Sequence, residues 1–228
     1  MSKIAVITAR GGSKRIPKKN IKEFCGKPII EYSVNAAVKS GIFDTVMVST
    51  DSREIADVAS ACGAEVPFYR SEKTSNDYAT TADVISEVLE EYGKLSKKYE
   101  YLCCIYPTAP FLTAERLSAG MKALEESGAD SAVPVVKFGF PPQRAVIIED
   151  GLLKFKWPEY AMARSQDLES FYHDAGQFYC LKVESFISQR KLIMGKTVPI
   201  VLPELEVQDI DNVEDWKIAE VKYRLLHG

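Results

Sequence analysis

Short β-type runs alternate with helical patterns along most of this chain, and that alternation limits its fold more than any other feature of the sequence. The first run, KIAVITA at 3–9, is almost continuously apolar, as expected for a central parallel strand buried on both faces. Runs with strand composition follow at 45–50, 64–69, 99–106 and 131–136. Between them lie segments with helical periodicity at 27–41, 51–63, 80–93 and 113–128, the third opening on a capping-box pair, Thr80 and Asp83. This rhythm predicts an α/β protein with a Rossmann-like, doubly wound, mostly parallel sheet.

Residues 138–170 break the alternation. The stretch contains three prolines and no helical period, and 146–148 and 152–155 flank a turn, Glu149-Asp150-Gly151, that predicts a hairpin. Such an insertion either covers a site, makes a subunit contact or is a plain surface excursion. Strand composition returns at 176–183 and 196–203, and a closing amphipathic helix is predicted from Asn212. No linker divides the chain, so we expect one domain over 1–228 with an inserted arm at 138–170.

The distribution of charge is more informative than its total. The net charge of −3 over 228 residues gives no overall attraction to nucleic acid or to an anionic membrane. Six of the 29 lysines and arginines nevertheless fall in residues 1–20, which hold no acidic residue, and this indicates a local anionic ligand. The five cysteines show no paired spacing, and no signal sequence or spanning apolar run is visible, so we expect a cytoplasmic protein with reduced thiols.

The basic residues lie in a glycine-containing loop, ARGGSKRIPKKN, directly after the first strand. Ligands of open parallel sheets bind beyond the carboxyl ends of the strands, and glycines let backbone amides approach phosphate oxygens. Arg10, Lys14 and Arg15 would add charge-assisted hydrogen bonds. The loop matches neither the dinucleotide fingerprint nor the P-loop. It therefore predicts a third kind of nucleotide phosphate site; a solvated basic turn or an RNA contact are the alternatives, although no aromatic residue interleaves the charges.

Further blocks occur in order along the chain: GKPII at 26–30, VSTD at 48–51, YRSEKTSND at 69–77, YPTAPF at 106–111 and QDIDNVEDW at 208–216. With the basic loop they cover nearly the whole chain, and in this combination the sequence resembles the acylneuraminate cytidylyltransferases, or CMP-sialate synthetases. Tyr106 and ARSQDLESFYHDAGQFY at 163–179 resemble the pseudaminic acid branch of that family. Phe111-Leu112 stand where sialate-type members carry an arginine, which argues against N-acetylneuraminate as the sugar.

The resemblance implies a fold of the nucleotide-diphospho-sugar transferase type and a reaction that joins CTP to a nonulosonic (sialic-acid-like) sugar acid. The anomeric hydroxyl of the sugar would attack the α-phosphorus, giving a CMP-sugar and pyrophosphate, with Arg10, Lys14 and Asp211 as catalytic residues. The residues that it implies for CTP are Arg10, Gly11, Gly12, Ser13, Lys14, Lys19, Asn20, Arg70, Ser75 and Asp77, with Arg15 and Lys27 less firmly assigned. Those that it implies for the sugar acid are Tyr106, Arg164, Gln166, His173, Asp174 and Gln177.

Asp209 and Asp211 are the candidate metal ligands. On an extended segment, residues i and i+2 project to one face with Cβ atoms about 6–7 Å apart. Mg²⁺ (or Mn²⁺) takes one or two carboxylates together with phosphate oxygens, and the family motif implies a metal here. The alternative is that Asp209 ends a strand and Asp211 helps to cap the last helix.

Several alternatives remain open at this level. Legionaminate, neuraminate and 3-deoxy-octulosonate are other sugars for the same reaction, and a non-catalytic nucleotide-binding protein on the same fold is a different class. An RNA-binding domain is a third reading, against which the acidic remainder of the chain argues. No residue is assigned as general base. The arm and the resemblance lead us to expect a homodimer in which each arm completes the sugar pocket of its neighbour.

Overall fold

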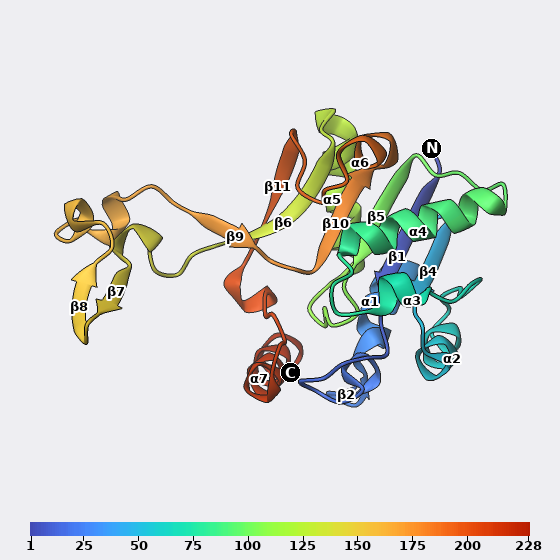
Figure 1. The fold of residues 1–228 in the computed structure, drawn as a ribbon, viewed down its shortest axis with the longest axis horizontal. Helices are drawn as coiled ribbons and strands as arrows, with labels where there is room; N and C mark the ends of the chain where they lie inside the picture. Colours follow the sequence, from blue (N-terminus) through green and yellow to red (C-terminus); the bar gives the residue numbers. More distant parts are fainter.

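The computed structural model describes residues 1–228 and confirms the predicted α/β architecture. A seven-stranded sheet has the order β11-β6-β10-β5-β1-β4, with β9 paired to β6 (Figure 1). Strands β1, β4, β5, β6 and β11 run parallel to one another, whereas β9 and β10 are antiparallel to their neighbours. The strands are β1 (Lys3–Thr8), β4 (Thr45–Ser49), β5 (Tyr101–Ile105), β6 (Ser131–Lys137), β9 (Tyr172–Asp174), β10 (Phe178–Lys182) and β11 (Thr197–Leu202).

Helices cover both faces of this sheet because alternate strand residues point to opposite sides. Ala5 and Ile7 belong to the apolar cluster that includes α1, α2 and α5, whereas Ile4 and Val6 belong to the cluster that includes α4 and α6. The helices are α1 (Ile29–Ser40), α2 (Arg53–Ala61), α3 (Glu72–Ser75), α4 (Thr81–Lys94), α5 (Ala114–Ser127), α6 (Val183–Gln189) and α7 (Val213–His227). The predicted capping box of Thr80 and Asp83 starts α4. None of the helices combines the length and apolar character needed to cross a membrane.

One predicted strand is absent. The segment 64–69 makes only a single bridge to the sheet, between Glu65 and Met47. Glu65 donates its amide to the Val46 carbonyl and accepts from Val48. Pro67 follows two residues later and has no amide to continue the pairing, so the ladder ends after one residue.

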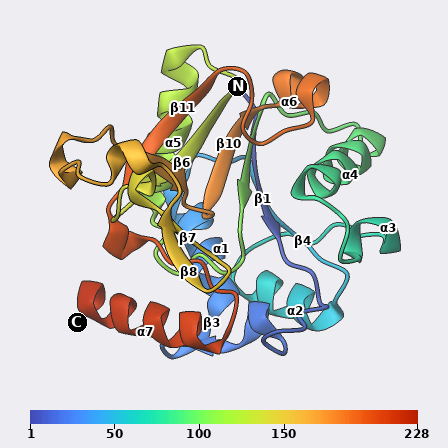
Figure 2. The same cartoon turned by 60° about the vertical axis from the view of Figure 1, so that its left-hand side comes forward.

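The residues after β1 wrap beneath the carboxyl ends of the strands. They include a 3-10 turn, η1 (Lys19–Ile21), and a short hairpin of β2 (Glu23–Phe24) and β3 (Lys27–Pro28). The indole of Trp216 in α7 packs edge-on against the Phe24 ring, with centroids 5.5 Å apart. This packing fixes the start of α7, and with it the Asp209–Asp211 segment, next to the loop after β1 (Figure 2).

The predicted arm projects beyond β6 and β9 as a separate body (Figure 1). Its hairpin pairs β7 (Val146–Glu149) with β8 (Leu152–Phe155) and turns at Asp150 and Gly151, which both have positive φ. Three 3-10 turns, η2 (Pro142–Arg144), η3 (Pro158–Tyr160) and η4 (Ser165–Asp167), lie on either side of the hairpin, and η5 (Glu204–Glu206) follows β11 in the body.

Candidate active site

The loop after β1 is held by contacts on both of its sides. The Ile16 side chain is buried, and the Asn20 side-chain amide donates to the Arg10 carbonyl at 2.9 Å. Gly11 lies so close to the start of α2 that a Cβ atom there would be 3.1 Å from the Cβ of Ser52. The Gly11 amide donates to Asp51 at 2.7 Å, so it does not offer this hydrogen bond to a phosphate, contrary to the expectation from the sequence. Neither Gly11 nor Gly12 lines the cavity described next.

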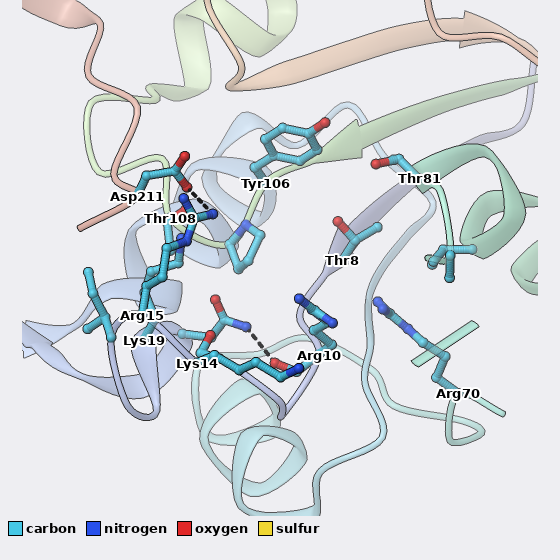
Figure 3. A pocket seen from close by; sticks show the side chains of 16 residues that line it. Thr8, Arg10, Lys14, Arg15, Lys19, Arg70, Thr81, Tyr106, Thr108 and Asp211 are labelled. Atoms are coloured by element: carbon cyan, nitrogen blue, oxygen red, sulfur yellow. Dashed lines mark hydrogen bonds and ion pairs between the residues drawn. The ribbon is translucent and has the colours of Figure 1, made fainter. Parts of the chain in front are cut away.

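A polar cavity of about 270 Å³ opens beside this loop (Figure 3). It lies at the carboxyl ends of β1 and β5, where an open parallel sheet places its ligands. Five cations and one carboxylate face it. The lining residues are Thr8, Arg10, Ser13, Lys14, Arg15, Ile16, Lys19, Asn20, Arg70, Ala79, Thr81, Val84, Tyr106, Pro107, Thr108 and Asp211. This excess of positive charge suits a polyanion such as a triphosphate.

Asp77 makes contacts that the resemblance did not indicate. Its carboxylate pairs with Arg10 at 2.7 Å and also with Lys14, rather than lining the cavity. Hydrogen bonds from Lys14 and Arg10 hold the pKa of Asp77 below its usual value. Asp77 therefore engages the same two cations that the sequence assigns to the triphosphate.

The Arg70 side chain is buried and is hydrogen-bonded to Ser49 at the end of β4. Its Nε donates to the Ser49 hydroxyl at 3.1 Å and its Nη2 to the Ser49 carbonyl at 2.8 Å. Burial lowers the pKa of Arg70, although Asp51 and Glu87 oppose this effect. Downstream, Ser75 does not reach the cavity because its hydroxyl donates to the Ser71 carbonyl at 2.7 Å.

Lys19 connects the loop to the Asp209–Asp211 segment. Its ammonium donates to the Ile210 carbonyl at 2.7 Å, and burial lowers its pKa in spite of the two nearby carboxylates. Arg15 pairs with Asp211 at 2.8 Å. Burial, reinforced by the charge of Asp211, raises the pKa of Asp209. Asp209 and Asp211 therefore lie close enough for their negative charges to repel each other.

A second cavity, of about 460 Å³, adjoins the first. Tyr106 lines both cavities, while Asp211 lines the first and Asp209 the second, so the predicted metal ligands lie at the boundary and do not share one cavity. His173 and Asp174, assigned to the sugar acid, also line the second cavity. The other lining residues are Val136, Lys137, Gly139, Ala175, Gly176, Glu204, Val207, Gln208 and Lys222.

Asp174 is already engaged on both of its oxygens. It accepts from the Tyr179 hydroxyl at 2.9 Å and from the Gly176 amide at 2.8 Å. Lys222 likewise donates to the Val207 carbonyl at 2.8 Å. Lys137 is a further cation that lines the same cavity. Sequence reasoning did not find Lys137, whose only signal was its position at the end of a predicted strand.

The remaining predicted residues lie outside both cavities. Arg164 and Gln166 are on the arm, where Arg164 pairs with Asp167 at 2.7 Å. The Gln177 side chain is buried and donates to the Glu206 carbonyl, which is a structural contact. Lys27 pairs with Glu31 at 2.9 Å at the start of α1. Within one chain, Arg164 and Gln166 therefore line neither cavity.

A doubly wound sheet with a cation-lined cavity at its carboxyl edge is the arrangement of a nucleotide-binding enzyme. The chain belongs to the cytidylyltransferase family, whose model matches residues 4–178. It is 36% identical over 228 residues to a pseudaminic acid cytidylyltransferase of Campylobacter jejuni, covering 100% of this chain and 98% of that protein. It is 31% identical to a CMP-N,N'-diacetyllegionaminic acid synthase of Legionella pneumophila, covering 95% of this chain and 94% of the other.

Solved structures share the fold at low sequence identity. A CMP:2-keto-3-deoxy-manno-octonic acid synthetase complexed with CTP superimposes with a TM-score of 0.68 at 16% identity, covering 100% of this chain and 99% of that one. A 4-diphosphocytidyl-2C-methyl-D-erythritol synthase from Anaerococcus prevotii gives a TM-score of 0.63 at 15% identity, with 98% of each chain covered. These likenesses establish the predicted fold type.

Proposed function

We propose that this protein transfers CMP from CTP to the anomeric hydroxyl of a nonulosonic acid, with pseudaminic acid as the preferred sugar. One observation carries this proposal: a cation-lined cavity lies beside a larger one, and Tyr106 and the Asp209–Asp211 segment form the boundary between them. Two adjoining cavities of this kind suit a triphosphate and a sugar acid that must meet at one phosphorus atom. The identity to the Campylobacter jejuni enzyme supports the choice of sugar.

In the proposed reaction, the anomeric oxygen forms a bond to the α-phosphorus while the bond to the bridging α–β oxygen breaks. Negative charge then grows on the departing pyrophosphate. Arg10, Lys14 and Arg15 line the first cavity on one loop and would stabilise that charge. Arg70, fixed by its two hydrogen bonds to Ser49, would hold the cytidine half without further reorganisation.

The donor set at the cavity boundary fits a divalent cation. Asp209 and Asp211 are two carboxylates in mutual repulsion, and no group of three or more candidate ligand side chains occurs in the protein. Mg²⁺ needs only one or two carboxylates when phosphate oxygens complete its shell. Asp209 and Asp211 would hold Mg²⁺ or Mn²⁺, which when bound supplies Lewis-acid polarisation of phosphate oxygens.

We further propose that the working form is a cytoplasmic homodimer. The arm exposes apolar side chains that a monomer leaves in water: Ile148, Leu152 and Leu153 are 77%, 65% and 69% exposed. We propose that in this dimer Arg164 of one arm completes the second cavity of the other chain. All five cysteines are free thiols, which supports a reducing compartment. Sedimentation of wild type against Leu153→Glu tests the dimer; a wild-type monomer contradicts it.

The function is tested by pyrophosphate release from CTP and Mg²⁺ with a panel of nonulosonic acids, run beside Asp211→Asn. We expect release with pseudaminic acid, and its loss in the variant. Release with legionaminate or neuraminate instead would keep the reaction and overturn the choice of sugar. Binding of CTP without release for any sugar would favour a non-catalytic nucleotide-binding protein.

A further inference from the structure

One wall of the first cavity is formed by a segment with little regular structure of its own. It runs from Arg70 through the single turn of α3 to Thr81, and Arg70, Ala79 and Thr81 face the cavity. Arg70 is anchored from β4, since its amide donates to the Thr50 carbonyl at 2.8 Å in addition to the contacts of its side chain. The residues that follow Arg70 have no such strand beside them.

Glu87 holds these residues from α4. Its Oε1 accepts the Ser71 amide at 2.7 Å and its Oε2 accepts the Ser71 hydroxyl at 3.1 Å. The Thr74 hydroxyl, on a buried side chain, donates to Oε2 as well. Ser71 is the N-cap residue of α3, and its own side chain makes no capping bond; Glu87 accepts the Ser71 amide, the contact that the N3 carboxylate makes in a capping box.

Helix α4 holds the backbone of Glu87 in a fixed position. Its first turn is closed by the capping box of Thr80 and Asp83, and Ile85 and Val88, on either side of Glu87, are buried in the core. The carboxylate is therefore carried by a fixed helix and reaches into the segment beside it. Because Glu87 is hydrogen-bonded to both Ser71 and Thr74, it restricts the backbone conformation between Arg70 and Thr81.

We propose that Glu87 is a positioning residue for the nucleotide: through Ser71 and Thr74 it fixes the cavity wall between Arg70 and Thr81. This inference rests on the proposed function, because it takes CTP as the occupant of the first cavity. Glu87 does not line either cavity and would not touch the substrates. Substitution of Glu87 should therefore weaken CTP binding and leave the binding of the sugar acid unchanged.

Calorimetric titration of CTP with Mg²⁺ into wild type and Glu87→Gln tests the inference. We expect about tenfold weaker binding in the variant, equivalent to about 1.4 kcal/mol. The KM for the sugar acid and kcat should stay within about twofold, a split that general loosening of the fold would not give. Amides 71–79 should exchange hydrogen faster. Glu90→Gln, on an exposed residue of the same helix without a side-chain partner, is the matched control.

Thr74→Val removes one of the three contacts and gives a second test in case Glu87→Gln does not fold. It should weaken CTP binding in the same direction and by less. CTP binding within twofold of wild type in Glu87→Gln would overturn the inference, as would equal losses in kcat and both KM values. If wild type binds CTP but releases no pyrophosphate, the proposed function fails while the binding comparison still decides the role of Glu87. A wild type that does not bind CTP overturns both.

Discussion

Arg70→Lys is the substitution whose effect follows most directly from the geometry. In wild type, Nε and Nη2 are both used on Ser49, and Nη1 has no protein partner and remains available to the cavity. A lysine keeps the charge but has one compact ammonium group in place of a fork. It can satisfy the Ser49 carbonyl or face the nucleotide, and it cannot do both.

The magnitude follows from the bonds that are lost. A hydrogen bond from a charged donor contributes about 1.5–3 kcal/mol, and Arg70 is only 9% exposed, so water does not replace it readily. Loss of one such bond to CTP corresponds to about 10- to 100-fold weaker binding. The free energy of unfolding should fall by about 1.5–3 kcal/mol, the value of the lost bond from the guanidinium to the Ser49 hydroxyl.

CTP titration and urea unfolding, run on the same samples, measure the two effects. Arg53→Lys is the matched control, since Arg53 is exposed at the start of α2 and its side chain has no partner. CTP binding within twofold of wild type in Arg70→Lys would refute the assignment of Arg70 to the nucleotide. A loss of stability well above about 3 kcal/mol, with CTP binding unchanged, would show instead that Arg70 serves mainly the fold.

Three further predictions concern other parts of the molecule. Gly120→Ala places a Cβ atom 2.7 Å from the buried ring of Phe178, so overpacking of about 1–3 kcal/mol should outweigh a helix gain of about 1 kcal/mol; urea unfolding that shows a stabilised variant would contradict this. Asp77→Asn removes a carboxylate that pairs with Arg10 and Lys14, the two cations proposed to bind the triphosphate. CTP should therefore bind more tightly, and this increase in affinity should shrink as the KCl concentration is raised. Weaker binding would instead place Asp77 on the nucleotide itself. Burial acts to raise the pKa of Glu87, but hydrogen bonds from Thr74 and Ser71 outweigh it, so the pKa is lowered overall. The ionised Glu87 carboxylate therefore stabilises the fold above pH ~4.3, and this stabilisation is lost as the pH falls through the folded-state pKa. The difference in unfolding free energy between wild type and Glu87→Gln should therefore shrink from pH 5 to pH 3, and a constant difference would disprove this.

The sequence predicted most of the fold because its signals are local. The apolar run at 3–9, the capping box of Thr80 and Asp83, and the turn at Asp150-Gly151 each specify a structure from neighbouring residues. The run at 64–69 failed for an equally local reason, since Pro67 ends its pairing after one residue. Propensity alone cannot register the loss of one amide donor.

The site was harder to predict because side-chain partners depend on tertiary distance. Lys19 and Ile210 are 191 residues apart in the chain, and motif order alone indicated that the basic loop meets the Asp209–Asp211 segment; the structure shows the Lys19 bond to the Ile210 carbonyl. No local pattern indicates that Asp77 would turn to Arg10, or that Glu87 would reach Ser71. Arg164, assigned from its motif, lies on the predicted arm at 138–170, where it pairs with Asp167 and lines neither cavity.

CMP transfer from CTP to a sugar acid is the reaction proposed for this protein. ³¹P NMR of CTP, Mg²⁺ and pseudaminic acid with catalytic enzyme tests this most directly. We expect the three CTP resonances to be replaced by one phosphodiester resonance and one equivalent of pyrophosphate, and no change when the sugar is omitted. Conversion of CTP to free CMP or CDP, or an unchanged spectrum with every nonulosonic acid, would contradict it.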